Sequence, residues 1–104
     1  MSDELYLPEK NRIELLSFKV LDETRIRATV ELNKDHQKPC LLLTLIDSKG
    51  TLLAKTIILN MYEHHIEFTL HYRRQSAVKP IFLHCATFFE EDKLINQKSV
   101  EILE

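Results

Sequence analysis

A four-residue polar turn between two apolar runs constrains the fold of this chain more than any other feature. The turn, residues 47–50 with the sequence DSKG, separates the apolar residues 41–46 from the apolar residues 51–59. A short turn that ends in glycine and is flanked by strand-length runs is typical of a β-hairpin. We therefore predict two antiparallel strands joined at this turn.

The same succession of apolar run and polar turn recurs along the chain. Residues 25–32 alternate between apolar and polar side chains, which is the period of a half-buried strand. Further strand-length runs occupy 12–21, 40–46, 51–59, 64–73, 81–89 and 94–103. Seven short runs at this spacing match the pattern of an immunoglobulin-like or fibronectin-III-like β-sandwich.

We expect an all-β fold, a single-domain seven-stranded antiparallel β-sandwich over residues 11–104, preceded by a flexible leader at 1–10. A small open β-barrel is the alternative. One sheet is expected to hold 12–21, 25–32 and 64–73, and the other 40–46, 81–89 and 94–103, with 51–59 at the edge of either. Apolar residues change parity within 12–21, which indicates a β-bulge or a strand that crosses between sheets.

Composition excludes several classes of function. One glycine in 104 residues rules out a glycine-rich phosphate loop. A net charge of -2 argues against nucleic acid or an anionic membrane surface as partner. No apolar stretch approaches the roughly 20 residues of a membrane-spanning helix, and the acidic start does not resemble a signal peptide. We therefore expect a cytoplasmic protein without a cofactor.

The two cysteines, Cys40 and Cys85, are expected to be buried free thiols. An inter-sheet disulfide is the alternative, and the sequence does not say whether the two residues are close. Cys85 and the adjacent His84 would point to opposite faces of a strand, so they do not form a nucleophilic pair. We expect no catalytic residue.

Histidine offers the one hint of a polar site. His65, Glu67 and His71 share the outward parity of residues 64–73, and Arg27 lies on the outward parity of 25–32. His65 and His71 are separated by roughly 20 Å of strand and cannot bind the same ion. We expect no metal, and keep a small metal-dependent enzyme or a ligand-binding domain on this histidine face as the alternative function.

Two charged segments are weaker candidates. The acidic turn at 90–92 has ligands suited to calcium, although solvated acidic turns are far more common. Arg73 and Arg74, with Lys79, form a basic loop that could hold a phosphate or an acidic partner, although a solvated loop explains it as well.

The excess of apolar side chains is the most informative feature for function. Runs 40–46, 51–59 and 81–89 are apolar on both parities, whereas a two-sheet sandwich buries one face of each sheet. We expect an exposed interface formed by Leu42, Ile46, Leu53, Ile57, Leu59, Phe82 and Phe88. The hypothesis is a non-enzymatic protein-interaction or structural module, most simply a homodimer. The alternative is that bulges and twist bury both parities within one domain.

Overall fold

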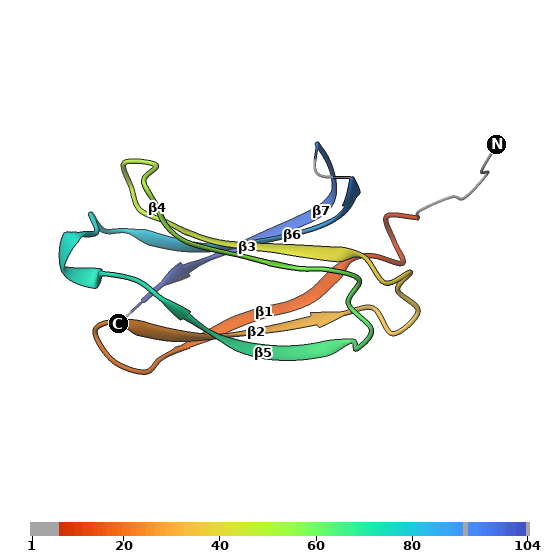
Figure 1. Cartoon of the computed structure of the whole chain (residues 1–104), viewed down its shortest axis with the longest axis horizontal. Helices are drawn as coiled ribbons and strands as arrows, with labels where there is room; N and C mark the ends of the chain where they lie inside the picture. Colours follow the sequence, from red (N-terminus) through yellow and green to blue (C-terminus); the bar gives the residue numbers. More distant parts are fainter. Residues whose placement is uncertain (1–6, 91, 104) are drawn as a thin grey trace.

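The computed structural model describes residues 7–90 and 92–103, which form seven antiparallel strands (Figure 1). Their bounds are β1 Ile13–Val20, β2 Arg25–Leu32, β3 Cys40–Ile46, β4 Leu52–Ile58, β5 His65–His71, β6 Ile81–Glu90 and β7 Lys93–Ile102. A single 3-10 turn, η1 Arg74–Ser76, lies between β5 and β6.

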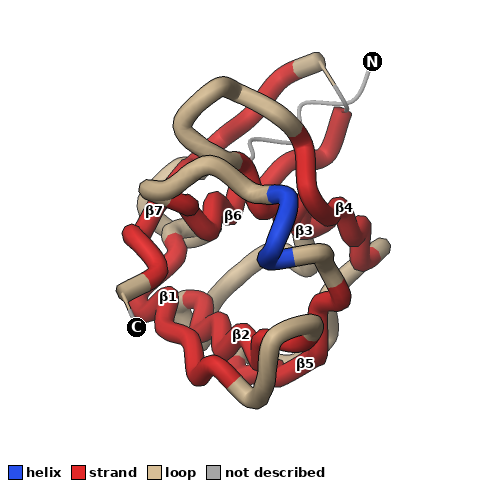
Figure 2. The backbone as a smooth tube through the Cα atoms, turned by 90° about the vertical axis from the view of Figure 1, so that its left-hand side faces the viewer, coloured by secondary structure: helices blue, strands red, loops and turns tan. Residues whose placement is uncertain are grey.

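The strands form two sheets that face each other. One has three strands in the order β1-β2-β5, and the other has four in the order β4-β3-β6-β7. Seen from the end of the molecule, the two sheets are separate layers rather than a closed barrel (Figure 2). The predicted all-β sandwich and the predicted division of strands between its sheets are confirmed, and β4 takes the edge beside β3.

The core lies between the two sheets and is filled by the inward parity of each strand. Leu41, Leu43 and Leu45 of β3 are completely buried, as are Leu83 and Cys85 of β6. The opposite sheet contributes Ile26, Ala28 and Val30 of β2, also completely buried. Burying a large aliphatic side chain stabilises a fold by about 1.5–3 kcal/mol, so the alternation seen in the sequence is what holds the sheets together.

Two irregularities in strand pairing change which side chains reach the core. In β1 the register shifts between Ile13 and Leu15, which confirms the bulge predicted from the parity change. A second shift lies between Leu45 and Ile46 of β3, where β4 pairs. There Leu52 is opposite Ile46, whereas the next residue, Leu53, packs against the core.

Residues before β1 are tied to the loop between β2 and β3. The buried side chain of Asn11 donates to Leu7 O and to Gln37 Oε1, both at 2.9 Å, and its Oδ1 accepts from Gln37 N at 2.9 Å. Of the predicted leader, residues 1–6 lie outside the described residues, and 8–10 form a turn. No helix within 7–90 and 92–103 is long and apolar enough to cross a membrane.

Candidate functional site

The outward side of the four-stranded sheet carries apolar side chains from all four strands, which we call the apolar face. Leu42 of β3 lies between Ile57 of β4 and Ala86 of β6, and Ile46 lies between Leu52 and Phe82. The apolar face is defined here by Leu42, Ile46, Leu52, Ile57, Phe82 and Leu94. Four strands of one sheet therefore contribute to one surface.

Several of these side chains are unusually exposed for their size. Leu52 is 53% exposed, Ile57 42%, Leu94 39% and Phe82 37%, while Leu42 and Ile46 are half-buried. A hollow of about 200 Å³ opens in this surface, with Leu42, Ile57 and Leu94 among its lining residues. Isolated apolar residues on a surface are ordinary, whereas a group of them around a hollow is a candidate interaction surface.

Of the seven residues expected at an interface, five lie on or beside the outward surface of the four-stranded sheet. Leu42, Ile46, Ile57 and Phe82 belong to the apolar face, and Leu59, 70% exposed, lies just beyond the end of β4.

The other two differ: Leu53 is half-buried, and Phe88 is buried. Leu53 packs against the core because the register shift beside Ile46 turns it inward. Phe88 has the outward parity and lines the hollow, but it is only 5% exposed because neighbouring strands carry the large side chains Leu42 and Leu94 around it.

A polar row crosses the apolar face, formed by Lys55, Thr44, His84 and Ser99 side by side in the strand register. Thr44 lies at its centre, between Lys55 and His84 in the strand register, and is 7% exposed. Its hydroxyl is buried without a hydrogen-bond partner. His84 Nε2 lies 3.0 Å from Gln97 Oε1 on β7. The charged residues Lys55 and Glu101 stand on the two edge strands, β4 and β7, and Lys55 also lines the hollow.

The outward side of the three-stranded sheet is polar and holds the predicted histidine site. His65 Nδ1 lies 2.9 Å from Glu31 Oε2, and His65 Nε2 lies 3.1 Å from Glu67 Oε2. Hydrogen bonds that His65 donates, first to Glu31 and second to Glu67, raise the pKa of His65 above its usual value, against the smaller effect of desolvation. Because both ring nitrogens face carboxylate oxygens, the arrangement favours the doubly protonated imidazolium.

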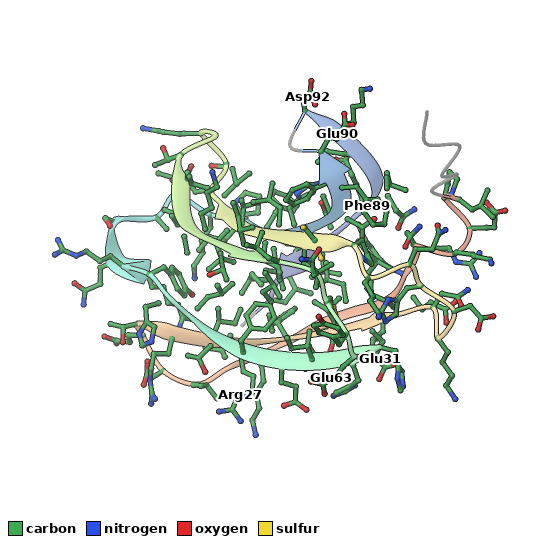
Figure 3. The ribbon with its side chains drawn as sticks, turned by 45° about the vertical axis from the view of Figure 1, so that its right-hand side comes forward. Arg27, Glu31, Glu63, Phe89, Glu90 and Asp92 are labelled. Atoms are coloured by element: carbon green, nitrogen blue, oxygen red, sulfur yellow. The ribbon has the colours of Figure 1, made fainter. Side chains whose placement is uncertain are left out.

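The structure brings together only part of the predicted polar site. His65 and Glu67 are joined, whereas Arg27 lies opposite Thr69, and His71 lies opposite Arg25 at the other end of β5. Figure 3 shows Arg27 and Glu31 well apart on the outer face of this sheet. The two carboxylates flank opposite nitrogens of one ring and do not converge on a point, so the group has the geometry of a charge cluster and not of a coordination site. In the described part of the chain, no group of three His, Cys, Asp or Glu side chains could hold a metal ion.

Glu31 is the member of this cluster that was not included in the predicted site. It occupies the outward parity of β2 and lies directly opposite His65 in the β2–β5 pairing. The signal that could have found it is the cross-strand register, which a single sequence does not supply because one strand can pair with another at several offsets.

The cysteines are buried free thiols on opposite sides of the four-stranded sheet. Cys40 pairs with Phe88 on the outward parity and is 8% exposed, whereas Cys85 pairs with Leu43 on the inward parity and is completely buried. Burial raises the pKa of the Cys85 thiol to about 12. A thiol held protonated in an apolar core does not act as a nucleophile.

The acidic turn after β6 is exposed and partly neutralised. Glu90 Oε2 forms an ion pair with Lys93 Nζ at 3.4 Å, and Glu91 is outside the described residues. Glu90 and Asp92 lie at the β6–β7 turn, on the opposite side of the molecule from Arg27 (Figure 3).

The fold resembles domains within much larger proteins. A "putative beta-galactosidase" from Bacteroides fragilis aligns with a TM-score of 0.58 and 12% identity, over 89% of this chain and 17% of that one. A glycosyl hydrolase family 2 member from Bacteroides cellulosilyticus aligns with a TM-score of 0.56 and 13% identity, over 89% and 15%. At this identity the similarity concerns the fold alone. No protein-family model matches the chain, and no curated protein is similar in sequence.

Proposed function

We propose that the protein is a non-enzymatic interaction module whose apolar face docks against the same face of a second copy. The single observation that carries the proposal is the four-strand surface of exposed aliphatic and aromatic side chains around a hollow. Exposing such a surface to water is unfavourable by about 25 cal/mol per Å² of apolar area, and docking removes that cost.

Charge placement supports a second copy as the occupant. Face-to-face packing about a two-fold axis parallel to the strands lays β4 of one copy over β7 of the other. In the four-stranded sheet Leu52 and Glu101 lie on one cross-strand row, and Lys55 lies on the adjacent outward row. The same axis therefore brings Lys55 of each copy within reach of Glu101 of the other.

The size of the face supports weak association. Four strands about 4.8 Å apart and about 23 Å long present roughly 450 Å² per copy, whereas a typical stable interface buries about 800 Å² per partner. We therefore expect a dimer that dissociates on dilution. Larger proteins that contain this fold hold it as one part of a long chain, so a different apolar domain surface is the competing occupant.

The proposal includes a reducing, cytoplasmic setting. Cys40 and Cys85 carry free thiols on opposite faces of one sheet, so they cannot join in a disulfide without rearrangement of the strands. The fold therefore does not depend on a disulfide, and the chain can fold under reducing conditions.

The experiment compares two lysine substitutions at residues of similar exposure. Ile57→Lys places a charge in the apolar face, and Leu15→Lys places the same charge on the other sheet, where Leu15 is 39% exposed against 42% for Ile57. We expect Ile57→Lys to abolish self-association and Leu15→Lys to leave it unchanged, with similar melting temperatures for both. Equal self-association of the two variants would show that the apolar face is not the contact.

A further inference from the structure

Two adjoining hollows lie at the end of the sandwich opposite the β6–β7 turn (Figure 1). At this end η1 lies between the two sheets (Figure 2). The larger, about 570 Å³, lies between β4 and the end of β5, and the smaller, about 470 Å³, lies beside the β1–β2 turn. Thr24, Arg73 and Ser76 line both. A hydrogen bond of 2.9 Å from Tyr72 N to Thr24 O fixes their shared wall. These volumes fall in the usual range for small-molecule sites, about 300–1,000 Å³.

The larger hollow combines positive charge with an apolar wall. Arg73 and His71 supply the charged or chargeable groups, and Leu52, Leu53 and Tyr72 supply the apolar surface. No acidic residue lines it. In the described part of the chain, the guanidinium group of Arg73 has no ion-pair partner, although acidic residues are more numerous than basic ones in the sequence.

A buried and unsatisfied hydroxyl is the second, independent sign of a ligand. Tyr72 is 5% exposed and forms part of the wall of the larger hollow, and its hydroxyl has no hydrogen-bond partner. Burial raises the pKa of Tyr72, and the nearby positive charge of Arg74 opposes that rise. A buried hydroxyl without a partner destabilises a fold, so an acceptor supplied from outside the chain would stabilise Tyr72.

We infer that this hollow binds a small organic anion, with its carboxylate or phosphate held by Arg73 and Tyr72 and its apolar body against Leu52 and Leu53. An arginine fork matches the oxygens of either anion, and the tyrosine hydroxyl donates a further hydrogen bond to it. The site lies at the end of the sandwich and shares Leu52 with the apolar face.

The experiment is a titration of the ¹⁵N-labelled full chain by NMR, with phenyl phosphate as the probe. We expect saturable shifts of the Thr24, Leu53 and Arg73 amides, with a dissociation constant of about 1 mM or tighter. Inorganic phosphate is expected to bind at least about 5-fold more weakly, because it lacks the apolar body, and benzyl alcohol not to bind. Phenylacetate in place of phenyl phosphate shows which anion the site prefers.

Variants separate binding from folding. Arg73→Gln is expected to weaken binding at least about 10-fold, whereas Lys34→Gln, which removes the same charge from the loop before β3, leaves it unchanged. Tyr72→Phe is expected to weaken binding about 5-fold while the melting temperature stays equal or rises, because an unsatisfied group is removed. Ile57→Lys retains binding.

Three results would overturn the inference. The first is the absence of saturable shifts with both phenyl phosphate and phenylacetate. The second is binding that Arg73→Gln leaves intact. The third is a Tyr72→Phe variant that binds as well as the wild type and melts at lower temperature, which would show that the hydroxyl serves the fold and not a ligand.

Discussion

Asp47 Oδ2 accepts a hydrogen bond from the backbone N–H of Val78 at 3.1 Å, which joins the β3–β4 turn to the segment that leads into β6. The other oxygen, Oδ1, accepts from the backbone N–H groups of Lys49 at 2.9 Å and Thr51 at 3.0 Å. The residue is only 4% exposed. The carboxylate of Asp47 thus stabilises the β3–β4 turn and joins it to the segment before β6.

Replacing Asp47 is expected to destabilise the fold. Burial by itself raises the pKa of Asp47, but the backbone hydrogen bonds from Val78, Thr51 and Lys49 outweigh it, so the pKa lies below 3.8. A lowered folded-state pKa means that the stabilisation is present at neutral pH and is lost as the pH falls through that value. Asp47→Ala should lower the melting temperature by several degrees at pH 7 and flatten its decline below about pH 4.

Asp35→Asn is the control, because Asp35 is exposed in the loop before β3. It should leave both the melting temperature and its pH dependence unchanged. An Asp47→Ala protein as stable as the wild type at pH 7 would contradict the role assigned to this carboxylate.

Substitutions of Gly50 test whether glycine is required in the turn because of its backbone conformation alone. Its φ is +80°, and a Cβ placed there would meet no atom within 4 Å. Gly50→Ala therefore costs only conformational strain, about 1 kcal/mol, which lowers the melting temperature by roughly 4–8 °C in a domain of this size. Gly50→Asn should lose less, since Asn tolerates positive φ. Equal losses for Ala and Asn in thermal denaturation would point to a different cause.

His65 is expected to titrate above its usual range. Hydrogen bonds to Glu31 and Glu67 raise the pKa of His65 above 6.5. The ion pairs therefore stabilise the fold below pH 6.5, and that contribution is lost as the pH rises through the folded-state pKa. An NMR titration of the imidazole should show the raised pKa. Glu31→Gln should lower it more than Glu67→Gln, because Glu31 makes the larger contribution.

Glu14→Gln is the matched control for His65. Glu14 is an exposed carboxylate on the same sheet that pairs with Arg12 at 3.0 Å and not with His65. If Glu14→Gln moved the pKa of His65 as far as Glu31→Gln does, the cause would be the general charge of the sheet and not the two hydrogen bonds.

Cys85 is expected to be inert towards alkylation in the folded protein. With a pKa of about 12, roughly one thiol in ten thousand is ionised at pH 8, and the side chain is completely buried. In a Cys40→Ala protein, iodoacetamide at pH 8 should label Cys85 only after denaturation, as intact-mass spectrometry would show. Rapid labelling of the folded variant would mean that β6 opens easily at this point.

The sandwich could be predicted from the sequence because its signals are local. Period-two alternation in β2 and the turn before Gly50 each depend on a few neighbouring residues. The bulge in β1 was also readable, since the apolar residues change parity within the strand. These features follow from the pleat of a single strand and need no knowledge of its neighbours.

The candidate sites could be predicted only in part because they depend on pairing between strands. Leu53 points inward owing to a register shift against β3, and Glu31 joins His65 through the β2–β5 register. The end hollow was anticipated only as the basic loop of Arg73 and Arg74, because its apolar wall comes from β4. The orientation of Leu53, the contact of Glu31 with His65 and the wall of the end hollow all depend on which strands pair and at what offset. Local composition does not encode that pairing.

The central claim is that the apolar face joins two copies of the chain, and sedimentation velocity tests it most directly. The chain has a mass of 12.3 kDa. Over a range from about 10 µM to about 500 µM, we predict a weight-average mass that rises from one chain towards two, and that stays at one chain for Ile57→Lys. A wild-type protein that remains at 12.3 kDa throughout this range would contradict the claim.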